Sequence, residues 1–509
     1  MKLNYKRVIF VSLAFFLIQM FWQCYDSIIP KILTDKFGME QWLSGAVMAL
    51  DNVLALVLLP VFGALSDKCR SKRGRRTPFI AVGAAFACAF FVLLGFADNM
   101  QLSSISKISD TQSKETLSFL YNEELGAVSE RIHAAFPSEE EFCEIEMYDS
   151  DGDLTEDYQN YVTPARQAYA WRQTVKNPVP LTVFALLLLL ILVSMSVFRS
   201  PAVALMPDVT PKPLRSKANA LVNLLGTLAG ATVLVLGIVF GTGKTENAVM
   251  SYTSFFSVIA ALMALALCAF LFFVKEKKWS DEASFINEGL GEAERTTDEG
   301  HEKSERRKLR QGERTSLILL LLSVALWYVG YNAVTTKYSV YAGELLGVDY
   351  NATLLVALGV AALSFLPVGA ISTRIGRKKT ILFGVALLGA SFLSAAFITS
   401  KSPSWLMNIL FALSGIGWAA INVNSFPMVV ELATGNDVGK YTGLYYAASM
   451  AAQCIAPSLS GVFLEYVSMK TLFPFGAIAV GASFVTMLFV RHGDSRQGRE
   501  DVIKGEKGQ

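Results

Sequence analysis

Charged residues are scarce in this chain of 509 residues, where Lys, Arg, Asp and Glu together make up only 17%. In soluble domains these four residue types usually reach about a quarter of the total. The shortage therefore excludes an ordinary soluble enzyme. The 45 basic residues are nearly balanced by 43 acidic ones, so the chain also lacks the strongly basic field typical of nucleic-acid binding.

Cysteine and histidine are few as well, with six cysteines and three histidines. Cys24, Cys88, Cys268 and Cys454 lie in apolar runs, and no C-x-x-C or Cys/His spacing occurs. This excludes a disulfide framework and a zinc site. No pairing of a nucleophile with a base is found in the apolar runs, so we expect no enzyme, metal or cofactor.

What the sequence does have is long apolar runs, each able to cross a hydrocarbon core of roughly 30 Å as a helix. The first run lacks a small-x-small cleavage site and is read as a helix rather than a signal peptide. We therefore predict an all-α polytopic membrane protein. The twelve predicted spans are 8–29, 43–66, 78–97, 179–206, 219–240, 251–274, 315–336, 351–372, 380–399, 405–430, 441–464 and 471–490.

Lys and Arg gather in alternate connections between these spans. The positive-inside rule then places both termini in the cytoplasm of a cell (plasma or inner) membrane. The basic residues are Lys68, Arg70, Lys72, Arg73, Arg75 and Arg76 after the second span, and Arg374, Arg377, Lys378 and Lys379 after the eighth.

Two long polar segments interrupt the pattern. Residues 275–314 are charged and poor in apolar residues, which predicts a flexible cytoplasmic linker between an N-terminal bundle (1–274) and a C-terminal bundle (315–490). The segment from residue 491 is expected to be a cytoplasmic tail. Residues 98–177 form an acidic extracytoplasmic insert, and helical apolar spacing over about 115–136 favours a small folded cap.

The two halves are related by an offset of 306 residues. The offset takes Tyr25-Asp26 onto Tyr331-Asn332, Lys31 onto Lys337, and Gly63-Ala64-Leu65-Ser66 onto Gly369-Ala370-Ile371-Ser372. Parallel repeats of this kind place a substrate site near the membrane midplane, between two six-helix bundles. The repeat therefore predicts a transporter.

The most specific motif is Gly63-x-x-x-Asp67-Lys68 followed by Arg73-Gly74-Arg75-Arg76, with a weaker copy from Gly369 to Arg374 and Arg377. It resembles the signature loop of the major facilitator superfamily, which implies that fold, with twelve helices in two pseudo-symmetric bundles. The resemblance also implies a cytoplasmic gate. Its residues here are Gly63, Asp67, Arg73, Arg75, Arg76, Arg374 and Arg377. Plain positive-inside anchoring is the alternative.

The residues of this loop and of the neighbouring spans resemble two groups within that superfamily more closely. Ser66-Asp67-Lys68-Cys69, Arg73-Gly74-Arg75-Arg76 and Pro78-Phe79-Ile80 resemble the sucrose transporters, while Asp51 with Pro60 resembles the melibiose-permease group. Ser200-Pro201 and the following Ala204-Leu205-Met206-Pro207-Asp208 match either group. The resemblance implies cation-coupled sugar symport.

Asp26, Asp51 and Arg199 are charged residues inside predicted spans. A charge at mid-bilayer costs at least about 2.5–3.5 kcal/mol, so such a group normally faces a cavity or a partner. All three histidines lie outside the spans, which leaves a carboxylate to carry a coupling proton. Asp51 is the first candidate and Asp26 the second, and an Asp51–Arg199 pair would be either structural or a switch. Lys337 is expected to extend to the membrane surface.

Polar and aromatic side chains in the spans are the candidate sugar contacts, because amides both donate and accept hydrogen bonds. Hydrogen bonding between helices is the alternative reading. Arg199 stands where melibiose permease has an acidic sugar-binding residue, so it is expected to bind hydroxyls or a sugar carboxylate. The remaining candidates are Gln19, Gln23, Asn332, Asn422, Asn424, Trp418 and Gln453.

The resemblance and the intramembrane charges together predict proton-coupled symport of a glucoside or disaccharide, such as sucrose or maltose, by alternating access. Ala55 replaces a second acidic residue of melibiose permease, which favours protons over sodium. Sodium-coupled sugar symport, proton-coupled efflux of a drug or metabolite, and a receptor built around the insert remain alternatives. The expected partners are a small sugar and the lipid bilayer, without nucleic acid, and we expect a monomer.

Overall fold

The computed structural model describes residues 4–211, 214–297, 311–432 and 438–492. Parts of the predicted linker (298–310) and tail (493–509) lie outside the described residues. The chain forms two compact units. Unit 1 contains Met1–Met39, Val53–His301 and Gly347–Asn351, and unit 2 contains Glu40–Asn52, Glu302–Leu346 and Ala352–Gln509.

The described residues include twelve helices long and apolar enough to cross a membrane, which confirms the predicted all-α polytopic architecture. A helix satisfies its backbone hydrogen bonds internally, as the hydrocarbon core requires. In unit 1 the spanning helices, apart from the shared α2 (Gln41–Lys68), are α1 (Tyr5–Lys31), α3 (Thr77–Ser104), α8 (Val179–Val209), α9 (Arg215–Phe240) and α10 (Thr253–Phe273). Those of unit 2 are α12 (Gln311–Tyr341), α13 (Tyr350–Ile375), α14 (Arg377–Ala395), α15 (Ser404–Glu431), α16 (Val438–Tyr466) and α17 (Leu472–Leu488).

The first and seventh spans are longer than predicted. α1 continues into a π-helical turn, η1 (Ile32–Lys36), and α12 continues into another, η6 (Ala342–Leu346). Lys31 and Lys337 are consequently not at the ends of their spans. Both are buried: the Lys31 ammonium donates to the Thr242 carbonyl at 3.4 Å, and that of Lys337 donates to the Gln41 carbonyl at 2.7 Å. The expectation that Lys337 reaches the membrane surface is therefore wrong.

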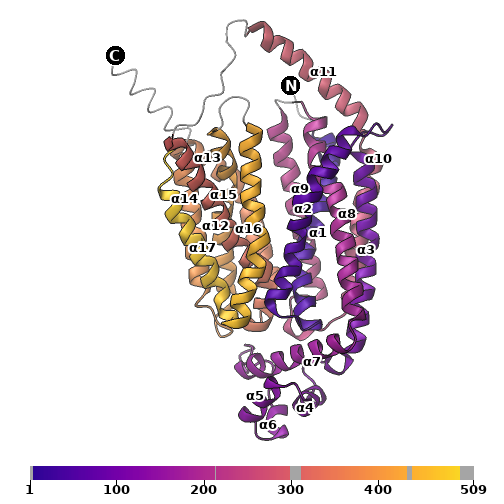
Figure 1. The fold of residues 1–509 in the computed structure, drawn as a ribbon, viewed down its shortest axis with the longest axis vertical. Coiled ribbons are helices and arrows are strands. Elements are labelled where there is room, and N and C mark those ends of the chain that lie inside the picture. The colour runs from indigo at the N-terminus through magenta and orange to yellow at the C-terminus, as the bar shows by residue number, and fades with distance from the viewer. Residues whose placement is uncertain (1–3, 212–213, 298–310, 433–437, 493–509) are drawn as a thin grey trace. The chain divides into compact units, whose positions relative to one another are not determined.

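The insert forms a small helical cap at the end of unit 1 opposite α11 (Glu276–Thr297) (Figure 1). It holds α4 (Lys114–Asn122), α5 (Ala127–Ala135), α6 (Glu139–Cys143), η3 (Tyr158–Val162) and α7 (Thr163–Lys176). α4 and α5 fall where the sequence has helical apolar spacing. The cap has a hydrophobic core in which Leu120, Ile132 and Phe142 are fully buried, and Ala248 and Val249 between α9 and α10 also belong to this core.

The cap is held against unit 1 by close packing and by polar contacts. A Cβ added at Gly38 would lie 2.2 Å from the Gln167 carbonyl oxygen of α7, so only glycine allows the chain to pass there. The Gln101 side-chain amide donates to the Lys36 carbonyl and to the Thr174 hydroxyl, at 2.8 and 3.0 Å. α3, η1 and α7 are thereby tied together.

The first part of α2 belongs to unit 2 and packs on α16. A Cβ at Gly45 would lie 2.2 Å from the Pro457 carbonyl oxygen, and one at Gly461 would lie 2.4 Å from that of Gln41. The two backbones are thus in direct contact. The Gln41 N–H also donates to the Glu465 carboxylate at 2.7 Å, which satisfies a backbone donor at the start of α2.

Residues 275–314 differ from the expectation of a flexible linker, because their first half is helix α11. Trp279 and Ala283, four residues apart, are buried on one face, while Lys278 and Asp281 are exposed. Periodic burial of this kind stabilises a helix even in a charged sequence. The Arg7 guanidinium covers the Trp279 ring at 5.4 Å and pairs with Glu282, which holds α11 to the start of α1.

Candidate functional site

In unit 1, the predicted sugar contact Arg199 lies against Trp22. The Arg199 guanidinium lies over the Trp22 ring at 4.9 Å from its centroid, which joins α8 to α1 by a cation–π contact. The Trp22 Nε1 is buried and has no hydrogen-bond partner among the described residues. A buried donor without a partner is costly, so this N–H is well suited to a bound hydroxyl.

The two glutamines and Asp26 lie on the same helix, α1. The Gln23 Nε2 donates to the Ser27 hydroxyl at 3.0 Å, and Gln19 packs against Gly226 of α9, where an added Cβ would lie 3.0 Å from the Gln19 Cγ. Gln19 and Gln23 are half-buried, whereas Asp26 is exposed in this structure.

In unit 2, aromatic side chains gather around Trp418. The Trp418 ring stacks on Tyr331 with centroids 3.6 Å apart and planes 1° apart, and Tyr328 meets it edge-on at 5.3 Å. The Ser425 and Tyr445 hydroxyls lie 2.9 Å apart, within hydrogen-bond distance, beside this group. Because Tyr331 covers one face of Trp418, a ligand can stack only on the opposite face.

The aromatic centres of the two units are related by the sequence repeat. The offset of 306 takes Trp22 onto Tyr328 and Tyr25 onto Tyr331. In unit 2 Trp418 of α15 contacts both tyrosines of the pair, and in unit 1 Arg199 of α8 lies over Trp22. Sequence reasoning missed the tyrosines, although their i, i+3 spacing on one helix face was a usable signal.

The predicted amides of unit 2 share one arrangement. Each donates its NH₂ group to the backbone carbonyl four residues earlier in its own helix, which fixes the side-chain direction and leaves the amide oxygen as an acceptor. These bonds are Asn332 to Tyr328 (2.8 Å), Asn422 to Trp418 (3.1 Å), Asn424 to Ala420 (2.9 Å) and Gln453 to Ser449 (3.2 Å).

Asp51 lies in the part of α2 that belongs to unit 2. Its side chain is 9% exposed, and one carboxylate oxygen accepts a hydrogen bond from the Asn52 amide at 2.7 Å. Arg199 belongs to unit 1. The Asp51–Arg199 pair therefore stays a prediction.

The loop motif forms a network that we call the latch cluster: Asp67, Arg75, Arg76, Asp208 and Glu276. Arg76 pairs with Asp67 and with Asp208, the latter at 2.9 Å, and Arg75 reaches the other Asp208 oxygen at 2.8 Å. Glu276 accepts the backbone N–H of Arg76 at 2.8 Å, at the start of α3. The sequence motif contains only the first three of these residues.

The other predicted gate residues are placed differently. Gly63 lies close to α8, since an added Cβ would be 2.9 Å from the Ser200 hydroxyl oxygen. The Arg73 side chain is exposed outside the latch cluster. In unit 2, Arg374 is exposed and an Arg377 guanidinium nitrogen donates to the Pro427 carbonyl at 3.4 Å. The weaker second motif thus contributes a backbone contact.

Comparisons with known proteins agree with this architecture. A family model described as "Major Facilitator Superfamily" matches residues 168–366 and 354–507, and one described as "MFS/sugar transport protein" matches residues 11–109. The chain therefore belongs to the major facilitator superfamily, as the signature loop indicated. It is a multi-pass membrane transporter and not an enzyme.

Individual relatives are more distant. Sucrose transport protein SUT4 of Oryza sativa subsp. indica is 35% identical over 71 residues, 14% of this chain and 12% of the relative. Multidrug resistance protein 3 of Bacillus subtilis is 25% identical over 167 residues, 32% of each chain. The chain thus matches only a small part of these relatives. The inward-open structure of the xylose transporter XylE from E. coli superposes with a TM-score of 0.57 at 13% identity over 96% of both chains, which shows the shared fold.

Proposed function

We propose that this transporter carries a sugar together with protons, as a symporter that works by alternating access. The observation that carries the proposal is the chemistry of the candidate residues: amide oxygens near stacked aromatic rings in unit 2, and an indole N–H without a partner next to a guanidinium in unit 1. Sugars present hydroxyls at their rims and apolar faces between them, so amides and aromatic rings match both parts. The match of residues 11–109 to a sugar-transport family supports the same substrate class.

The proposed sugar contacts come from both units. Unit 1 supplies Trp22, Arg199, Gln19 and Gln23, and unit 2 supplies Asn332, Asn422, Asn424, Trp418 and Gln453. The planar guanidinium of Arg199 donates two hydrogen bonds at once to sugar hydroxyls. A glucoside or disaccharide is the proposed substrate, in line with the name of the sucrose transport protein that matches part of the chain.

Asp51 is the proposed proton carrier, with Asp26 as the second candidate. Protonation of Asp51 removes its negative charge, which weakens any pairing with Arg199 and frees the guanidinium for the sugar. The burial of Asp51 supports this role, since an acidic residue within a span normally faces a cavity or a partner rather than lipid. Sodium would require more oxygen ligands than this single carboxylate supplies.

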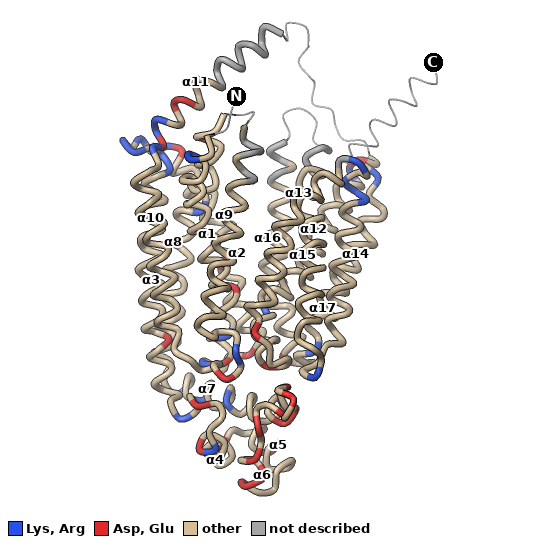
Figure 2. Tube along the Cα trace, turned by 180° about the vertical axis from the view of Figure 1, so that it is seen from behind, with Lys and Arg blue, Asp and Glu red and all other residues tan. Residues whose placement is uncertain are grey.

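The latch cluster is the proposed gate, and we place it in the cytoplasm together with both termini. Basic residues gather where α10 meets α11 and at one end of α14, while the cap has many acidic residues together with some basic ones (Figure 2). This distribution supports the positive-inside orientation. Breaking the Arg76 ion pairs would release the ends of α2, α3 and α8 when the transporter changes state.

Proton-coupled drug efflux is the second candidate. The aromatic group around Trp418 would also bind a flat organic cation, and a multidrug resistance protein matches the chain at comparable distance. The amides argue for the sugar, because an apolar drug would leave their oxygens without partners.

The proposal is tested by reconstituting the full chain in liposomes and measuring uptake of labelled sugars under an imposed gradient. Inward proton gradients should drive accumulation of a glucoside or disaccharide, whereas an inward sodium gradient alone should not. Accumulation driven by sodium would overturn the choice of ion. Proton-driven export of an organic cation, with no sugar taken up from a broad panel, would overturn the symport proposal.

A further inference from the structure

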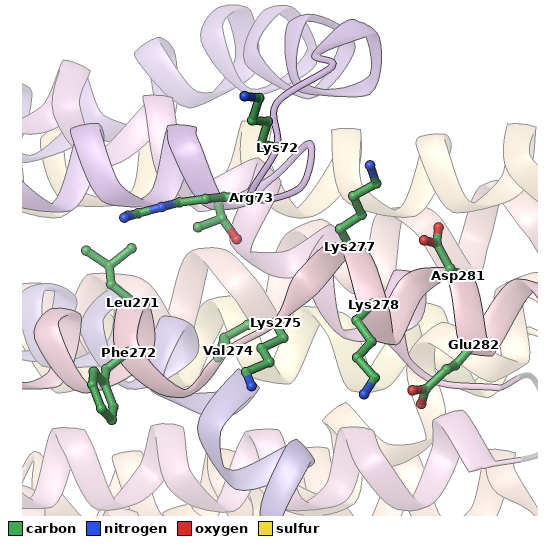
Figure 3. Close-up of a pocket in the computed structure, with 11 residues that line it drawn as sticks. Lys72, Arg73, Leu271, Phe272, Val274, Lys275, Lys277, Lys278, Asp281 and Glu282 are labelled. Carbon is green, nitrogen blue, oxygen red and sulfur yellow. The ribbon is translucent and has the colours of Figure 1, made fainter.

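A cavity of about 700 Å³ lies at the α11 end of unit 1, apart from the candidate site. Its walls come from two places, the loop between α2 and α3 on one side and the junction of α10 with α11 on the other (Figure 3). Lys72 and Arg73 extend from the loop, and Lys275, Lys277 and Lys278 extend from the junction.

The charge of the cavity is strongly positive. Its five Lys and Arg residues are all exposed, and none of their side chains is in an ion pair within the described part of the chain. The cavity contains two carboxylates, Asp281 and Glu282, and Glu282 is already paired with Arg7. Such a concentration of cations attracts an anion with several oxygen acceptors.

The cavity also has an apolar floor. Leu271, Phe272 and Val274 line it at the end of the α10 span, and Phe272 is 78% exposed. A small soluble anion has no apolar part that could contact the Phe272 ring. A phospholipid at the boundary of a bilayer has both parts that this cavity matches. Its phosphate suits the Lys and Arg side chains, and its acyl chain suits the exposed Phe272 ring.

We propose that this cavity binds the headgroup of an anionic phospholipid, with its phosphate among the Lys and Arg side chains and its acyl chain along Phe272. The leaflet is the cytoplasmic one, which rests on the proposed orientation of the chain. A bound headgroup bridges the motif loop and α11. Between Lys275 and Lys277 in the chain is Glu276 of the latch cluster, which is buried and accepts hydrogen bonds at the start of α3.

The test is native mass spectrometry of the full chain titrated with phosphatidylglycerol or with phosphatidylcholine. We expect phosphatidylglycerol to bind more tightly. One Lys or Arg near an anionic surface raises the binding affinity about fivefold. The double variant Lys277→Gln/Lys278→Gln should therefore lower the affinity for phosphatidylglycerol about 25-fold. Lys72→Gln, on the other wall, should lower it about fivefold. The matched control Lys6→Gln/Lys379→Gln removes two exposed cations outside the cavity and should change nothing.

Three results would overturn the proposal. The first is equal affinity of wild type and Lys277→Gln/Lys278→Gln for phosphatidylglycerol, with both proteins folded by circular dichroism. The second is equal affinity for the two lipids. The third is displacement of the lipid by inorganic phosphate at equal concentration, which would indicate a site for a soluble anion. None of these measurements needs a transported sugar, so they are independent of the proposed transport function.

Discussion

At the scale of single residues, the membrane spans contain charged side chains of two kinds. Lys36 and Asp98 form an ion pair with both side chains fully buried, and Asp98 also accepts the Tyr252 backbone N–H at 2.9 Å. This pair supports the structure next to the cap. Asp51 and Arg199, in contrast, are the residues that we propose for proton coupling and sugar binding.

Replacing one member of the Lys36–Asp98 pair should be strongly destabilising. Asp98→Ala leaves an uncompensated buried ammonium and is expected to lower the free energy of unfolding by about 3–5 kcal/mol. The double variant Lys36→Met/Asp98→Leu removes both charges and should recover most of the loss. Thermal unfolding in detergent measures both. A double variant no more stable than Asp98→Ala would contradict this explanation.

The latch cluster gives a second comparison between residues. The Asp208 side chain is 16% exposed and binds two arginines, whereas that of Asp67 is 58% exposed and binds one. Exposed ion pairs contribute about 0–1 kcal/mol, while losing a partly buried, charged hydrogen bond costs about 1–3 kcal/mol. Asp208→Asn should therefore lower the unfolding temperature more than Asp67→Asn does. The reverse order would mean that Asp67 is the main partner of Arg76.

From the sequence, the motif predicted residues that the structure brings together, while their role as a gate stays a prediction. The motif contained Asp67, Arg75 and Arg76, and the structure brings these three together. Lys36 and Asp98 were missed because the predicted spans end at residues 29 and 97, about two helical turns before Lys36 and one residue before Asp98. Asp208 and Glu276 are far from the motif in the chain, and no local pattern links them to it.

At the scale of elements, the sequence predicts helices well because a bilayer span is defined by composition over about 20 residues. It predicts their ends poorly, since η1 and η6 continue through charged residues that pack inside the protein. Helix α11 was not predicted for a similar reason, because its stability depends on the burial of Trp279 and Ala283 against neighbouring residues.

The docking of the cap depends on a close approach at Gly38. Gly38 and Gly126 both have φ near +65°, which costs a Cβ-bearing residue about 1–2 kcal/mol, yet only Gly38 would also clash with α7. Gly38→Ala should therefore destabilise the protein clearly more than its control Gly126→Ala. It should also make the cap more sensitive to limited proteolysis. Equal effects of the two variants would show that α7 does not pack on Gly38.

At the scale of the whole molecule, the proposed orientation can be tested with two native cysteines. Cys143 lies in the cap and Cys69 in the basic loop. In variants that retain one cysteine each, a membrane-impermeant maleimide added to intact cells should label Cys143 and spare Cys69. Inverted vesicles should give the opposite pattern. Labelling of Cys69 alone in intact cells would reverse the orientation.

The pH dependence of this labelling follows from the surroundings of Cys143. Burial, and then the charge of Glu139, raise the pKa of the Cys143 thiol above its ordinary value of 9.0. Since the thiolate is the reactive form, the raised pKa means less reactive thiol at neutral pH. The labelling rate should therefore still be rising at pH 9. A rate that levels off below pH 8 would contradict the raised pKa.

Coupling of sugar to protons through Asp51 is the central claim. The most direct measurement is external pH in weakly buffered, energy-depleted cells after a sugar is added. We predict alkalinisation with a glucoside or disaccharide, abolished by a protonophore and by Asp51→Asn, while Asp51→Asn still exchanges labelled sugar across the membrane. Sugar-induced alkalinisation of unchanged size in Asp51→Asn would contradict the assignment of the proton carrier, and sugar uptake without any pH change would contradict proton coupling.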